Sequence, residues 1–138
     1  MIRPRPVPIS WLYERFVPIR WETVDDPIRS LMVELNRVGY VTLCSCCGFR
    51  YQGQRGKSHA TGPYVSCDGG QVDPKVRRGL YRVVRATRWW HLEWPSWFVP
   101  PGRIVVFRAW DPPDQAKPLR ARQARAAIRE LEDACRAL

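Results

Sequence analysis

The chain has 138 residues, 45% of them hydrophobic, and a formal net charge of +10 at pH 7, from 23 Lys and Arg against 13 Asp and Glu. This length supports one hydrophobic core and excludes two, and no apolar run reaches the roughly 20 residues that a membrane-spanning helix needs. The charge therefore predicts an acidic partner, which is nucleic acid, an acidic protein surface or an anionic membrane surface, and we expect no membrane insertion.

The chain begins with a segment that favours an extended arm. Residues 1–10 alternate proline with arginine or an apolar residue, which disfavours internal hydrogen bonds. Residues 11–21 then predict one strand or two short ones. A helix follows up to Gly39, because Asp25 or Asp26 can cap it and apolar side chains recur at every third or fourth position.

A cysteine-rich strand is expected after this helix, over residues 40–47. A Gly-rich basic loop over 48–62 and a short strand over 63–67 complete this half of the chain. Asp73-Pro74 then opens a second helix.

The remaining segments complete a mixed fold. Residues 88–94 and 103–110 predict strands, so residues 11–110 read strand-helix-strand-strand-helix-strand. That order predicts an α+β domain, ferredoxin-like or a similar two-layer sandwich. Residues 111–117 predict a stiff proline-rich linker, and residues 118–138 a C-terminal helical extension.

The cysteines allow two interpretations. Cys44 and Cys47 have the C-x-x-C spacing, and His59 and Cys67 follow, so a zinc site with three thiolates and one imidazole is one of them. Small apolar packing is the other, because cysteine is among the most buried residue types. We expect no bound metal and no other cofactor. Five clustered cysteines also fit a reducing compartment, which predicts the cytoplasm.

Phosphate contacts are expected from two basic segments. The loop around Gly56-Lys57-Ser58 does not match the phosphate-binding loop G-x-x-x-x-G-K-[ST], so it predicts a cationic surface without nucleotide specificity. A solvated loop without a ligand is the alternative. The candidate phosphate-contacting residues, here and on the second predicted helix, are Arg50, Arg55, Lys57, Arg77 and Arg78.

An aromatic run over residues 89–98 predicts either a partner-binding patch or a face that the C-terminal helix covers. Strand alternation places Trp90, Leu92 and Trp94 on one face of the strand. Trp89, His91 and Glu93 lie on the other face. Both faces of such a strand cannot easily be core. An exposed aromatic patch rimmed by arginine is typical of interfaces, and its candidates are Trp89, Trp94 and Trp97.

The C-terminal helix has an unusual order of charges. Arg120, Arg122, Arg125 and Arg129 fall in its first half, where positive charge opposes the helix dipole. An ordinary amphipathic helix is one interpretation. The other is a docking helix whose arginines meet an acidic partner across the linker, with few core contacts.

A partial resemblance lies between Leu35 and Asp68. The residues Thr42-x-x-Ser45-Cys46-x-Gly48, followed by Pro63-Tyr64-Val65, resemble the T-x-S-S-C-S-G core of the tRNA-wybutosine-synthesising family and of small phage proteins with related motifs. The resemblance implies an RNA-modifying activity, with Ser45, Cys46 and Gly48 as site residues.

The length, basicity and helical tail of the whole chain also look like the small regulators by which phages of thermophilic bacteria redirect host RNA polymerase. We expect such a non-enzymatic regulator, in the cytoplasm of the host cell, with RNA polymerase as protein partner and non-specific contacts to nucleic acid. An RNA-modifying enzyme acting around Cys46 is the alternative.

Overall fold

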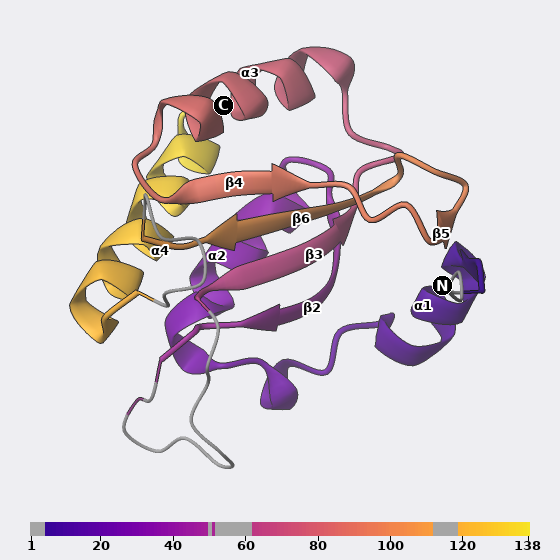
Figure 1. The fold of residues 1–138 in the computed structure, drawn as a ribbon, viewed down its shortest axis with the longest axis horizontal. Helices are drawn as coiled ribbons and strands as arrows, with labels where there is room; N and C mark the ends of the chain where they lie inside the picture. Colours follow the sequence, from indigo (N-terminus) through magenta and orange to yellow (C-terminus); the bar gives the residue numbers. More distant parts are fainter. Residues whose placement is uncertain (1–4, 50, 52–61, 112–118) are drawn as a thin grey trace.

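The computed structural model describes residues 5–49, 51, 62–111 and 119–138. Its centre is a four-stranded sheet in the order β2-β3-β6-β4, in which all neighbouring strands are antiparallel. Figure 1 shows these strands running side by side. The strands are β2 (Val41–Cys46), β3 (Tyr64–Asp68), β4 (Trp90–Glu93) and β6 (Ile104–Ala109).

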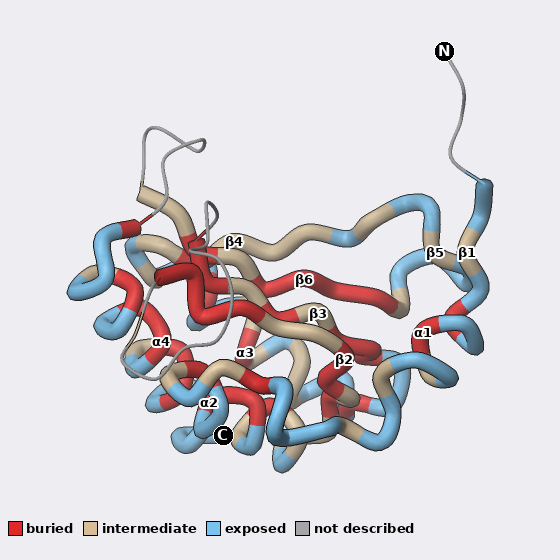
Figure 2. Tube along the Cα trace, turned by 90° about the horizontal axis from the view of Figure 1, so that it is seen from below, coloured by how far each residue is buried: buried red, intermediate tan, exposed pale blue. Residues whose placement is uncertain are grey.

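Three helices cover one face of this sheet: α2 (Asp26–Arg37), α3 (Pro74–Ala86) and α4 (Ala121–Arg136). All three were expected from the sequence, and α2 and α3 have proline in the first turn. The Asp73 carboxylate caps α3 by accepting a hydrogen bond from the backbone N–H of Lys75 at 2.8 Å. Figure 2 shows the buried side of these helices turned toward the strands.

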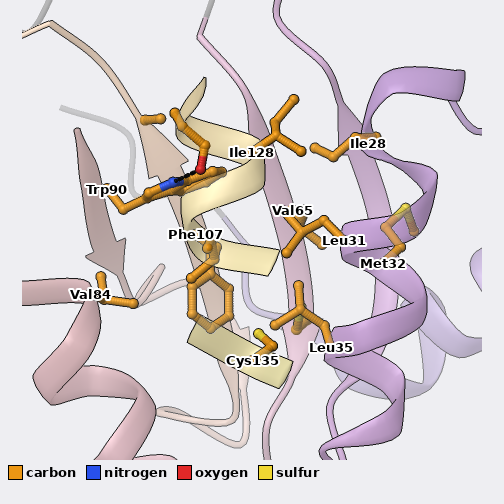
Figure 3. Close-up of a cluster of buried hydrophobic side chains, with 14 of the residues drawn as sticks. Ile28, Leu31, Met32, Leu35, Val65, Val84, Trp90, Phe107, Ile128 and Cys135 are labelled. Carbon is orange, nitrogen blue, oxygen red and sulfur yellow. Dashed lines mark hydrogen bonds between the residues drawn. The ribbon is translucent and has the colours of Figure 1, made fainter. Parts of the chain in front are cut away.

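The main hydrophobic core lies between the sheet and these three helices. Its largest fully buried side chains include Leu35 of α2, Phe107 of β6 and Leu131 of α4. The buried indole of Trp90 donates a hydrogen bond from Nε1 to the backbone oxygen of Ala127 in α4, at 2.6 Å (Figure 3). Strand β4 and helix α4 are therefore fixed to each other inside the core.

Helix α4 is thus a core element, and the expectation that few core contacts lie beyond Trp110 is wrong. Its apolar stripe packs against α2, and it buries six residues. Hydrophobic burial of this stripe outweighs the unfavourable placement of arginines near its N-terminus. Except for Asp111, the expected linker lies outside the described residues. The buried residues are Ala124, Ala127, Ile128, Leu131, Glu132 and Cys135.

The N-terminal segment differs from the expectation. Residues 11–21 do not form a strand: helix α1 (Ile9–Phe16) is followed by a short 3-10 helix at Trp21–Thr23. The expected arm ends early, because β1 (Val7–Pro8) pairs in parallel with β5 (Phe98–Val99). Apolar side chains at positions 9, 12, 13 and 16 have helical spacing, which lets α1 pack on the outer face of the sheet, opposite α2, α3 and α4.

A buried carboxylate holds α1 to the sheet. Asp68, at the end of β3, accepts hydrogen bonds from the Tyr13 hydroxyl at 2.5 Å and from Arg103 Nη2 at 2.5 Å. Burial alone raises the pKa of Asp68. The hydrogen bonds from Arg103, Tyr13 and Gly70 together lower it by more, so the pKa lies below its ordinary value. The pKa of the Tyr13 hydroxyl shifts in the opposite direction: burial and the nearby Asp68 carboxylate raise it to about 12.

The expected fold class is confirmed: the protein is α+β, with helices layered on a sheet and a C-terminal helix. The arrangement is a similar sandwich rather than a ferredoxin-like one. A split βαβ unit needs parallel strands in the sheet, and here the segment that would supply the first strand is α1.

Candidate anion-binding interface

Helix α3 presents a row of cations to solvent, which we call the α3 stripe: Lys75, Arg78, Arg82 and Arg85. All four are exposed, at intervals of three or four residues, so they lie along one side of the helix. The opposite side buries Leu80 and Val84. The helix contains no acidic residue. Within the part of the chain that the structure describes, none of the four side chains makes an ion pair or hydrogen bond. The stripe is therefore a concentrated positive surface.

A hollow of about 330 Å³ lies where α3 ends beside β4, and we call it the β4 hollow. Arg85 and Thr87 line it from the α3 side, and His91, Leu92 and Trp94 line it from β4 and the residue after it. The Trp94 ring is 45% exposed and meets Tyr81 of α3 edge to face, with ring centroids 5.7 Å apart. Arg85 belongs to both the stripe and the hollow, so cations and an apolar recess form one surface.

The outer face of the sheet continues this surface with further rings. His91 stacks on Trp110, with centroids 4.0 Å apart and planes 10° apart. Burial lowers the pKa of His91, although Glu93 opposes the shift, so the imidazole is neutral at pH 7. Arg108 lies opposite His91 in the sheet register; it pairs with Glu93 at 3.3 Å and lies over the Tyr64 ring at 5.2 Å. The charge of Arg108 is thus partly balanced.

The three candidate tryptophans of the aromatic run lie in different surroundings. Trp94 lies beside the α3 stripe and is exposed. Strand β4 ends at Glu93, so the strand alternation that would bury Trp94 stops before it. Trp89 is half-buried against the main core, with the Arg88 guanidinium 5.4 Å from its ring centroid. Trp97 is 46% exposed, and its backbone oxygen accepts a hydrogen bond from Val7 N–H. Trp97 therefore borders the N-terminal segment.

The candidate arginines divide between two helices. Arg78 belongs to the α3 stripe, whereas Arg77 is half-buried. The helical spacing of the sequence already places the other three stripe residues on the same side of this helix as Arg78. The other candidate arginines are all exposed: Arg120 at the residue before α4, and Arg122, Arg125 and Arg129 on the helix itself. The Arg125 guanidinium lies over the ring of Phe49, 4.7 Å from its centroid. Arg50, Arg55 and Lys57 lie outside the described residues.

The cysteines around Cys46 are mostly buried and pack inside the protein. Cys47 and Cys67 are buried and Cys44 is half-buried. His59 lies outside the described residues, and among those described no group of three or more His, Cys, Asp or Glu side chains could hold a metal ion. Cys47 Sγ donates to the backbone oxygen of Phe49 at 3.1 Å, and Cys47 N–H donates to Asp25 at 3.0 Å.

The thiols near Cys46 are poorly suited to nucleophilic attack. Burial raises the pKa of Cys46 above its ordinary value and that of Cys47 to about 12, so both stay protonated at pH 7. Ser45 is half-buried, and Gly48 adopts φ +80 with the backbone of Pro63 packed where a side chain would start. The segment therefore ends in a tight turn at Gly48.

The chain matches no protein-family model, no curated protein and no solved structure. None of the described helices has the length and apolar character needed to cross a membrane. The functional argument therefore depends on the surface geometry of this chain.

Proposed function

We propose that this protein is a small, basic, non-enzymatic regulator that binds a large acidic assembly in the cytoplasm. RNA polymerase together with its nucleic acid is the assembly that we expect, in a thermophilic bacterium or a host cell infected by a phage. The alternative, an RNA-modifying enzyme acting around Cys46, rests on the resemblance of that segment alone, and its buried protonated thiols do not favour it.

The α3 stripe is the observation that carries this proposal. Four exposed cations on a helix without an acidic residue create a positive field that attracts acidic partners and raises their association rate. Trp94 beside the stripe adds an exposed aromatic ring, the residue type most enriched where binding energy is concentrated. The exposed arginines of α4 add further positive charge to the surface of the protein.

A charge-reversal experiment tests the proposal. The double variant R78E/R82E should weaken binding to purified, nuclease-treated bacterial RNA polymerase by at least about tenfold, which is about 1.4 kcal/mol. The matched control R5E/R20E changes net charge equally at two exposed positions outside α3: Arg5 precedes β1, and Arg20 precedes the short 3-10 helix. It should bind within about threefold of the unchanged protein.

Two outcomes would contradict the proposal. One is that the unchanged protein does not bind the polymerase at low salt. The other is that both double variants lose the same affinity, because binding would then follow net charge alone rather than the α3 stripe.

A further inference from the structure

We propose that the α3 stripe and the β4 hollow together form a binding site for single-stranded nucleic acid. Phosphates lie along the stripe, and one unpaired base stacks on Trp94 at the hollow. This inference rests on the proposed function, because it uses the same stripe, and it names the chemical class of the acidic ligand.

The stripe suits a ligand that repeats its charge at each unit. From Lys75 to Arg85 it extends about 15 Å along the helix axis, with one cation per turn. A nucleic-acid backbone offers one anionic group per nucleotide, so several of them can be neutralised in succession. No acidic residue on α3 competes for these cations.

The hollow supplies the second half of the recognition. Its wall is largely apolar, from Val84, Trp90, Leu92 and Trp94, and its volume of about 330 Å³ is at the small end of ligand sites. Trp94 is exposed, while its edge contact with Tyr81 holds the ring in place. A base that stacks there has its own phosphate near Arg85, which lines the hollow.

The site requires an unpaired strand. Bases in a duplex are stacked inside it, and only single-stranded segments can place a base against a protein aromatic ring. His91, which lines the hollow, stacks on Trp110, and this pair would offer a neighbouring base a second ring surface. Stacking accepts any base, so binding should show little sequence preference.

The test measures binding of a fluorescent oligouridine of about 12 nucleotides by anisotropy, without polymerase. Four phosphate contacts should give a slope of about −3 for log affinity against log salt, and R78Q/R82Q should reduce its magnitude by about 1.4. W94A should lower affinity about fivefold or more. W21A, at another exposed tryptophan before α2, should leave it unchanged.

A ligand-side control avoids dependence on the stability of W94A. An oligomer of the same length with abasic positions should bind the unchanged protein about fivefold or more weakly, and a blunt duplex should also bind more weakly. Equal binding of abasic and normal oligomers, or W94A equal to W21A, would overturn the inference. Binding to polymerase without binding to the oligomer refutes this inference alone, whereas the reverse result refutes only the proposed regulator.

Discussion

Leu131 of α4 is the residue whose truncation best tests whether this helix belongs to the core. Its side chain is fully buried where α4 packs against α2 and the sheet. Leu131→Ala removes buried methyl groups and leaves a cavity, which costs 2–5 kcal/mol in typical cores, and we expect about 3 kcal/mol. With an unfolding entropy of about 2.1 cal/mol/K per residue over 138 residues, Tm should fall by about 10 °C.

Calorimetry and urea unfolding followed by tryptophan fluorescence would measure this change. Trp90 contacts α4 directly through its hydrogen bond to Ala127, so the part of the emission that comes from this one of the seven tryptophans changes when that helix undocks. The control Arg122→Ala, on the exposed side of the same helix, should change stability by about 0.5 kcal/mol or less. A loss below about 1 kcal/mol for Leu131→Ala would refute the core assignment and restore the detached docking helix.

Two further predictions concern ionisable groups. Because the pKa of Asp68 is lowered in the folded protein, its contribution to stability is present above the unfolded pKa of about 3.9 and is lost as pH falls through the folded value. The free energy of unfolding, measured between pH 7 and pH 3, should therefore fall at the acidic end, and Asp68→Asn should reduce this fall. An unchanged profile would contradict a stabilising role for the hydrogen bonds that Asp68 accepts. Alkylation of the native protein at pH 8 should modify Cys44 alone, because the other four thiols are buried with raised pKa values. Mass spectrometry showing rapid modification of Cys46 would contradict this.

The sequence predicts α2, α3, α4 and the four strands of the main sheet, because the apolar residues of each segment follow one dominant period. Capping and turn residues mark where several of these segments begin or end. Helix α1 escaped prediction for a physical reason. Its aromatic residues, Trp11, Tyr13 and Phe16, have high strand propensity, and prolines at positions 8 and 18 bound it. The helical spacing of Ile9 and Leu12 is visible only when their burial against the sheet is known.

The candidate surface was only partly predictable. The basic character of α3 follows from its sequence, but the proximity of Trp94 depends on where β4 ends and on the packing of Tyr81. The role of α4 could not be assigned from its pattern. An apolar stripe fits both a docked helix and a free one, and the choice depends on a partner, α2, that is far away in sequence.

The pairing of α2 with α4 has a consequence for synthesis of the chain. Ser30 donates a hydrogen bond to Glu132 at 2.9 Å and Arg37 donates one to the Cys135 carbonyl at 2.7 Å, across 102 and 98 residues. A ribosome adding about 5–20 residues per second completes α2 roughly 5 to 20 seconds before α4 is available. During that interval α2 can pack against β2, but the part of it that packs against α4 has no final partner. The main core therefore stays incomplete, and open to chaperones, until α4 has left the ribosome.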